Sequence, residues 1–399
     1  MCVRDAIPSF APMKRRGEHR NHGLNNHASQ PKKGDLQTIC ALQPKPFRYL
    51  VVIQSMTAPK QTRIFNNDLL ASYRQMGDPA ADAVVEALAL QGGRAALGGF
   101  MRYLADNQTL DTVGQEPVVQ TFFEQNSRFP AWLNRPLMDA GLAFFWKNPQ
   151  SIALILGCYS LPYCYAAADG AQVLWLSQRI KDDTFKRLEE TGDFLFGIMQ
   201  ERDWDNGKNF VKILKIRLMH AVIRYFTLHS GQWDNTWGCP INQEDMAGTN
   251  GAFSYIVVRG LRKSGIKTTE AGEEAYLYLW NVIGTILGVA EELLPQNLRE
   301  AYHLDRAIAK RQFRPSEAGK GLTLALLKTL QKQLPSTSLE NLPAAQMRFL
   351  LGDSVADLLG LPQVAFEKRL IEATALPIFP RVSFQNAAPS SSPLAKYLR

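Results

Sequence analysis

Hydrophobic positions recur every three or four residues along most of the chain from Met56 onward, which is the spacing of helices with one buried face. The stretch 78–91, DPAADAVVEALALQ, begins with an Asp-Pro pair suited to a helix N-terminus, and Gly92 and Gly93 are expected to end that helix. The polar–apolar alternation of a strand is scarce, with residues 48–54, RYLVVIQ, as a weak candidate. The pattern therefore predicts an all-α fold.

The same pattern sets the predicted domain boundaries. It covers residues 63–380, which we interpret as a single large helical domain. Residues 1–62 form a basic leader rich in Asn, His, Lys, Arg and Pro that is expected to be disordered, and residues 381–399 are expected to form a short flexible tail. Met56 directly precedes the helical pattern, so a mis-assigned start of translation is an alternative to a native leader.

The distribution of charge narrows the range of partners. The formal net charge of the chain is +8. Residues 1–55 contain nine Lys or Arg and three acidic residues, which gives +6 there and leaves +2 for the rest of the chain. Because residues 56–399 are thus nearly neutral, the charge argues against a nucleic-acid partner.

Targeting signals are also missing from the sequence. The leader has no continuous apolar segment of the kind that a secretory signal needs. The longest apolar run, residues 151–168, contains Pro162 and is shorter than the roughly 20 residues that cross a bilayer. The five cysteines include no Cys-x-x-Cys pair, which favours a reducing compartment. We therefore expect a cytoplasmic protein without a transmembrane segment.

Common catalytic motifs are absent from the sequence. It contains no glycine-rich dinucleotide or phosphate loop, no Gly-x-Ser-x-Gly elbow, no His-Glu-x-x-His pair and no EF-hand loop. This argues against nucleotide, serine-hydrolase and zinc-protease chemistry. The predicted helical domain contains three histidines, His220, His229 and His303, so a site built from several histidines has few candidates.

One predicted helix, residues 213–228 (ILKIRLMHAVIRYFTL), is apolar nearly all round and should be central in the fold. Its polar residues share one face, because Arg217 and Arg224 lie about 60° and 40° on either side of His220 at helical spacing. His229 lies on the opposite side of the helix and cannot join His220 at one metal ion. Buried guanidinium groups need anionic partners, and this face supplies none.

Two explanations of this face remain open. Carboxylates of neighbouring helices could pair with the arginines in a structural core network. Alternatively, the anion is a bound cofactor, and haem suits the residues because one neutral imidazole can ligate its iron while arginines pair with its propionates. A Cys-x-x-Cys-His motif is absent, so such a haem would be b-type and held without a covalent bond.

Several segments, in order along the chain, resemble the family of latex-clearing-protein and MpaB-type haem oxygenases, long catalogued as a domain of unknown function. Together they cover most of residues 70–362. The segments are 73–88 (YRQMGDPAADAVVEAL), 183–199 (DTFKRLEETGDFLFGIM), 216–224 (IRLMHAVIR), 238–266 (GCPINQEDMAGTNGAFSYIVVRGLRKSGI), 277–295 (LYLWNVIGTILGVAEELLP) and 348–362 (RFLLGDSVADLLGLP).

The resemblance implies an all-helical domain that encloses haem b and uses its iron. By position, His220 corresponds to the family's haem ligand and so to the metal ligand, while Arg224 and Arg217 are expected to bind the cofactor. Arg187 and Thr191 correspond to an arginine and a threonine of the preceding helix that help to form the site, and we expect them to be catalytic. Read alone, Arg187 lies in a charge-rich stretch typical of a solvated helix face.

One departure from the family bears on the substrate. Rubber-cleaving members have a lysine three residues after this arginine, together with an upstream glutamate, whereas this chain has Glu190 and, as the nearest acid, Asp169. We therefore expect a haem-dependent dioxygenase-type enzyme that cleaves a C=C bond of a prenyl or other unsaturated apolar substrate with O2, and not rubber. The apolar runs 151–168 and 276–290 are candidate pocket walls. The alternative is a haem-binding or structural helical protein without oxygenase activity.

Overall fold

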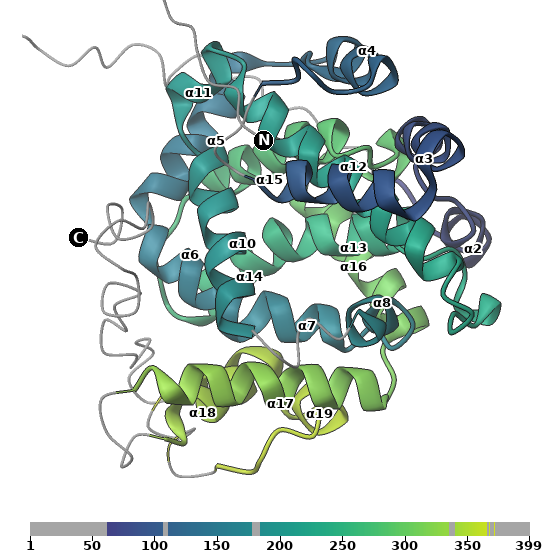
Figure 1. The fold of residues 1–399 in the computed structure, drawn as a ribbon. Helices are drawn as coiled ribbons and strands as arrows, with labels where there is room; N and C mark the ends of the chain where they lie inside the picture. Colours follow the sequence, from purple (N-terminus) through teal and green to yellow (C-terminus); the bar gives the residue numbers. More distant parts are fainter. Residues whose placement is uncertain are drawn as a thin grey trace, which may run out of the picture. The chain divides into compact units, whose positions relative to one another are not determined.

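The computed structural model describes residues 62–106, 111–177, 184–334, 340–364, 367 and 371, and throughout this part the protein is helical (Figure 1). Its α-helices are α2 (Asn67–Arg74), α3 (Pro79–Ala105), α4 (Pro117–Asn126), α5 (Arg135–Lys147), α6 (Pro149–Ile155), α7 (Leu161–Tyr165), α8 (Gly170–Leu176), α10 (Thr184–Ile198), α11 (Glu201–Asp205), α12 (Lys208–Leu228), α13 (Gln243–Phe253), α14 (Tyr255–Lys263), α15 (Glu270–Ile286), α16 (Leu298–Gln312), α17 (Glu317–Lys332), α18 (Leu342–Leu351) and α19 (Asp353–Leu358). Short π or 3₁₀ turns are η3 (Leu156–Ser160), η4 (Asn235–Trp237) and η5 (Glu291–Leu293).

The all-α prediction is confirmed. Within the described residues no strand forms, and one isolated β-bridge joins Ala167 and Phe313. The weak strand candidate at 48–54 lies outside these residues, as do most of the leader and the tail, so the predicted domain boundaries stay predictions. No helix in the described part is both long enough and apolar enough to cross a membrane.

Helix α3 begins where the sequence predicts, but the predicted end was wrong. Asp78 caps its N-terminus by accepting a hydrogen bond from the backbone N–H of Ala81 (3.4 Å), and Pro79 occupies the first turn. At Gly93 the backbone takes a φ of 57°, which a residue without a Cβ adopts at little cost. The helix then resumes and continues to Ala105, so the glycine pair produces a kink instead of an end.

Other boundaries also follow glycine and proline. Residues 291–312 form η5 followed by α16, and Pro295 separates the two. Residues 342–358 form α18 and α19, divided by Gly352 at a φ of 83°. Around Pro162 the chain stays helical through α6, η3 and α7, and the wider π turn immediately before α7 is where a proline ring avoids the clash that a regular helix would impose.

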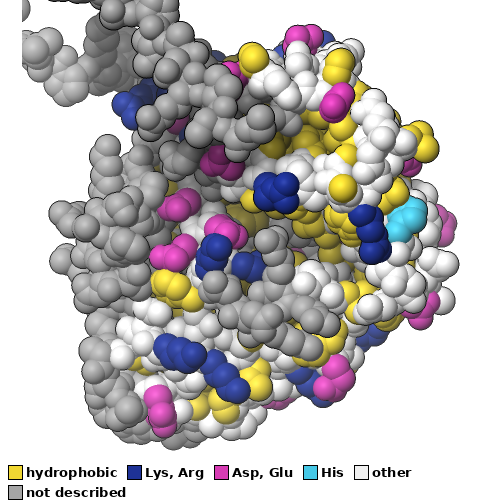
Figure 2. Space-filling view, in the orientation of Figure 1, with side chains coloured by type: hydrophobic (Ala, Val, Ile, Leu, Met, Phe, Trp, Pro, Cys, Tyr) yellow, Lys and Arg dark blue, Asp and Glu magenta, His cyan; other side chains and the backbone are white. Residues whose placement is uncertain are grey.

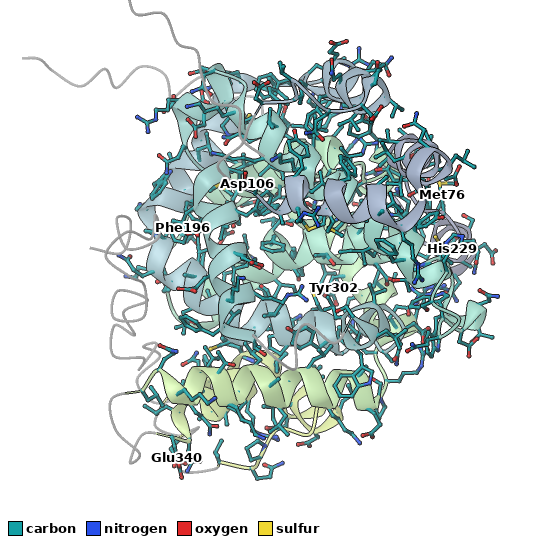
Figure 3. All side chains as sticks on the ribbon, viewed as in Figure 1. Met76, Asp106, Phe196, His229, Tyr302 and Glu340 are labelled. Carbon is teal, nitrogen blue, oxygen red and sulfur yellow. The ribbon has the colours of Figure 1, made fainter. Side chains whose placement is uncertain are left out.

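On the face drawn in Figure 2, Lys and Arg side chains are interspersed with Asp and Glu side chains. This agrees with the nearly balanced charge of residues 56–399. Of the three histidines in the predicted domain, His229 caps the C-terminus of α12 at the surface (Figure 3). Its ring stacks on that of Tyr225 with 4.1 Å between centroids. His303 is also exposed, and only the His220 side chain is largely covered by protein.

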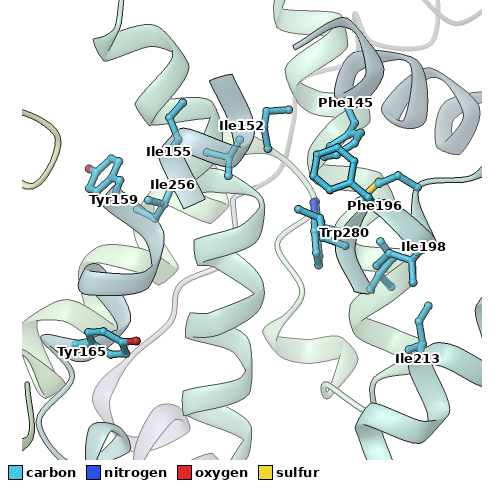
Figure 4. Packing of buried hydrophobic residues seen from close by; sticks show 14 of the residues in the cluster. Phe145, Ile152, Ile155, Tyr159, Tyr165, Phe196, Ile198, Ile213, Ile256 and Trp280 are labelled. Carbon is cyan, nitrogen blue, oxygen red and sulfur yellow. The ribbon is translucent and has the colours of Figure 1, made fainter. Parts of the chain in front are cut away.

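The main hydrophobic core surrounds α12 and α15. Among the described helices, the pairs α5–α15 and α3–α12 make the most extensive contacts. Along α12, Ile213, Leu218 and Val222 are fully buried, as predicted for a central helix. Figure 4 shows aromatic rings of neighbouring helices meeting in this core; the rings of Phe145 and Phe196, for example, pack edge to face with centroids 5.4 Å apart.

Candidate functional site

His220 lies halfway along α12 and carries an imidazole nitrogen that the fold leaves unused. Its Nδ1 atom is shielded from solvent and has no hydrogen-bond partner among the described residues. The pKa of His220 is lowered to about 4, mainly by burial and then by the Arg224 charge, with Asp78 acting in the opposite direction. The ring is therefore neutral at pH 7, which is the form that ligates a metal ion.

Arg217, one turn before His220, is paired with a carboxylate of α3. Its Nε and Nη2 atoms donate to the two carboxylate oxygens of Asp78, at 2.5 and 2.9 Å. Its Nη1 atom donates to Asn126 Oδ1 (3.3 Å) and to the backbone oxygen of Ile286 (3.4 Å). All three guanidinium nitrogens thus have protein partners.

Arg224, one turn after His220, is equally engaged. Its Nη1 atom donates to Asp82 on α3, while Nε and Nη2 donate to the backbone oxygens of Pro240 (3.0 Å) and Ile241 (2.8 Å). Ile241 has a φ of 51°, in a region that β-branched residues rarely adopt. The two bonds from Arg224 therefore hold a strained backbone segment directly before α13.

Two glycines leave room for these pairs. A Cβ atom on Gly77 would lie 2.7 Å from Asp82 Oδ2 and 2.9 Å from Arg224 Nε. On Gly288, whose φ is +85°, a Cβ would lie 2.5 Å from both Arg217 Nε and Asp78 Oδ2. A side chain at either position would push into an ion pair, because the backbone covers both pairs closely.

These contacts bear on the two explanations left open by the sequence. The arginines have internal carboxylate partners, as the core-network explanation requires, and their predicted contact with a cofactor stays a prediction. The network leaves His220 itself without a partner. An unpaired buried nitrogen costs roughly 1–3 kcal/mol, so the network alone does not account for a histidine at this position.

Arg187 and Thr191 lie on α10, which packs against α12. The Thr191 hydroxyl donates to the backbone oxygen of Arg187 (2.8 Å), and its side chain is exposed. Arg187 is half-buried. Burial raises the pKa of the Tyr165 phenol, and the charge of Arg187 lowers it in part. The structure places both residues on a helix next to that of His220, and their catalytic role stays a prediction.

Glu190 and Asp169 are the two acids where the sequence departs from the rubber-cleaving members of the family. Glu190 is exposed on α10. Asp169 is largely buried and pairs with Arg314 and, at 3.6 Å, with Arg74. The sequence did not reveal that Asp169 belongs to an ion-pair network.

That network extends to α13. Asn242 caps the N-terminus of α13 by accepting a hydrogen bond from the backbone N–H of Asp245 (2.9 Å). Glu244 in its first turn is fully buried between Arg74 (3.2 Å) and Arg311 (2.7 Å). The only signal in the sequence was the pair of acids in that turn, which does not indicate their partners.

A cavity of about 350 Å³ lies against this network, and all of its lining residues are polar or charged. The lining residues are Asn67, Arg74, Asp169, Thr236, Lys310, Arg311 and Gln312. None of them lies on α10 or α12, and such a lining does not suit an apolar substrate. By contrast, Figure 2 shows hydrophobic side chains inside a hollow on the face that it draws. Across the described residues, no three His, Cys, Asp or Glu side chains gather into a metal-ligand set.

Comparison with known proteins identifies the family. The family model "ER-bound oxygenase mpaB/B'/Rubber oxygenase, catalytic domain" matches residues 152–378. A rubber oxygenase of Streptomyces sp. (strain K30) is 26% identical over 305 residues, which cover 75% of this chain and 74% of that protein. The fold matches latex clearing protein LCP in the closed state with a TM-score of 0.64 and 24% identity, over 82% of this chain and 90% of that one. The resemblance found in the sequence is thus confirmed, and the chain belongs to the MpaB and rubber oxygenase family.

Proposed function

We propose that this protein is a haem b-dependent oxygenase in which His220 is the protein ligand to iron, and that it cleaves a C=C bond of a prenyl or other unsaturated apolar substrate with O2. The observation that carries the proposal is the state of His220: a neutral ring on the central helix, with a shielded nitrogen that no described residue uses. Haem needs only one such ligand from the protein, which suits a chain without a cluster of metal ligands in its described part.

When bound, haem supplies the oxygen-binding and redox chemistry that these side chains lack. The contributions of the chain are to orient the iron through His220 and to keep water away from the reacting groups. The buried apolar side chains of α6, η3 and α15 suit the second task, since Ile152, Tyr159 and Trp280 are almost fully covered. We assign Arg187 and Thr191 a catalytic role at the haem site, because they share a face of α10 and α10 packs against α12.

The acids of this chain support a substrate other than rubber. Glu190 is exposed and Asp169 is held by two arginines, so neither is placed as the free base that the rubber-cleaving members of the family are expected to use. A small prenyl compound or unsaturated lipid, which the protein can surround, fits an apolar interior better than a polymer chain.

Absorption spectroscopy tests the cofactor. The purified full-length protein should show a Soret band and release haem b on extraction, and His220→Ala should lose most of both. His303→Ala is the matched control, because His303 is exposed and its variant should keep the wild-type spectrum. A colourless wild-type protein that takes up no haem would refute the cofactor assignment.

Oxygen consumption tests the reaction. Haem-loaded protein should consume O2 with unsaturated prenyl compounds and release carbonyl products that mass spectrometry detects. Saturated analogues should give no uptake, because they lack the bond to be cleaved. Haem-loaded protein that consumes no O2 with any unsaturated substrate would support a haem-binding role instead.

A further inference from the structure

We propose that Asp78 and Asp82 of α3 are positioning residues for His220, acting through Arg217 and Arg224. We call the two contacts, Asp78 with Arg217 and Asp82 with Arg224, the α3–α12 ion pairs. The inference rests on the proposed function, because it concerns how His220 is presented to haem. In this inference the two arginines hold His220 in position and do not bind the propionates of haem.

The placement of the ion pairs fixes α12 on both sides of His220. Arg217 and Arg224 lie one turn before and one turn after His220 on the same face of α12. Their partners lie one turn apart at the start of α3. A single pair would leave α12 free to turn about the contact, whereas two pairs at separate heights restrict both its rotation and its sliding along α3. The rotation of α12 and its position along α3 together determine the direction in which the His220 ring points.

The ion pairs are shielded enough to hold this geometry. The side chains of Arg217 and Asp78 are 12% and 4% exposed, and those of Arg224 and Asp82 are 3% and 27% exposed. Solvent and salt weaken such pairs much less than pairs on an open surface. Asp78 is the N-cap of α3 and Asp82 lies in its first turn. Burial raises the pKa of Asp82, and the charge and hydrogen bond of Arg224 lower it in part.

The arginines have little capacity left for a propionate. Each nitrogen of Arg217 and of Arg224 already donates to Asp78, Asp82, Asn126 or a backbone oxygen. A propionate would have to displace these partners and leave a buried aspartate unpaired, which is costly. Gly77 and Gly288 also cover the pairs so closely that a Cβ would clash with them.

The two roles of the arginines give opposite expectations for the aspartates. If the ion pairs position His220, removing the charge of Asp78 or Asp82 loosens the bond between iron and histidine. If the arginines serve propionates, the same change frees a guanidinium group and binds haem more tightly. The variants Asp78→Asn and Asp82→Asn nearly keep the side-chain size, remove the charge and replace one accepting oxygen with an NH2 donor.

The test uses the haem-loaded full chain and measures the electron paramagnetic resonance spectrum of the ferric protein and the rate of haem transfer to apomyoglobin. Each variant should shift the spectrum and release haem about tenfold faster, the size expected when the support of a metal ligand is removed. Asp82→Glu should keep the wild-type spectrum. Asp78→Asn combined with Arg217→Gln should behave like either single variant, because both remove the same contact.

Glu300→Gln is the matched control for a merely structural effect. Glu300 is a fully buried carboxylate on α16 that pairs with Arg63 at 2.9 Å, away from α12. It should lower the melting temperature about as much as the aspartate variants and leave the haem spectrum unchanged. Unchanged spectra in both aspartate variants, or slower haem transfer, would overturn the inference.

A second measurement decides the inference even without haem. Diethylpyrocarbonate modifies unprotonated histidine rings, and mass spectrometry reports the rate at His220 in the apoprotein. The rate should be low in the wild type and in Glu300→Gln and severalfold higher in Asp78→Asn and Asp82→Asn; equal rates in all four proteins would overturn the inference. A wild type that never binds haem therefore defeats the proposed function alone, while the rate at His220 still tests the ion pairs.

Discussion

Gly141 on α5 gives a sharp test of how tightly the core around the site is packed. Helices α5 and α15 form the most extensive pair among the described helices, and Gly141 lies buried at their contact. A Cβ at this position would come 2.7 Å from Leu279 Cβ and closer still to the backbone oxygen of Ala275. Both neighbours are rigid parts of α15, so Gly141→Ala must move a whole helix.

The magnitude follows from two opposing terms. Alanine is intrinsically better than glycine inside a helix by about 1 kcal/mol. Overpacking a core typically costs about 1–3 kcal/mol, and this site lies at the upper end because the Cβ of Leu279 must retreat from 2.7 Å to at least 3.4 Å from the new methyl group. We expect Gly141→Ala to lower the free energy of unfolding by about 1–2 kcal/mol.

Urea unfolding followed by circular dichroism measures this change as a lower midpoint at an unchanged slope. Gly98→Ala on α3 is the matched control, because no atom lies within 4 Å of the Cβ that it would add. Without a clash, only the helix preference remains, and this variant should be stabilised by up to about 1 kcal/mol. The reasoning fails if the two variants shift the midpoint in the same direction.

Two further predictions concern titration. Hydrogen bonds from the Gln296 backbone and from Arg63 outweigh burial and lower the pKa of Glu300 below its usual 4.5. Its charged form therefore stabilises the fold above about pH 4.5, and this stabilisation is lost as the pH falls through the lowered pKa. Wild type and Glu300→Gln should differ in stability at pH 7 and converge in acid. A difference that stays constant with pH would contradict this reasoning. Burial raises the pKa of the Cys158 thiol to about 12. Mass spectrometry should therefore find Cys158 unalkylated at pH 8 until the protein unfolds. Rapid labelling of the native protein would contradict this, because it would show that the thiol is accessible.

Local signals in the sequence predicted local structure well. The Asp-Pro pair located the start of α3, and the apolar surface of residues 213–228 indicated the central helix. Each of these features depends on residues within a few positions of one another. The end of α3 was predicted wrongly because a glycine pair indicates a break in a helix without fixing the direction in which the chain continues.

Partners across long sequence distances could not be predicted in the same way. The sequence showed that Arg217 and Arg224 need anions, but not that Asp78 and Asp82 supply them. Asp78 was interpreted only as a helix cap, although the same carboxylate also accepts from Arg217. Periodicity alone singled out His220, whereas Arg187 and Thr191 came only from the family resemblance, and their roles stay predictions.

The kink at Gly93 has a consequence for the order in which the molecule folds. It lets both arms of α3 reach the same part of α12: Asp78 pairs with Arg217, and Lys215 Nζ donates to the backbone oxygens of Tyr103 (2.8 Å) and Asp106 (2.9 Å). These contacts join residues 109 to 139 positions apart. Because closing such long loops is entropically unfavourable, we expect them to form late, together with the rest of the core. A newly made chain would then acquire a site competent to bind its cofactor only in the final step of folding.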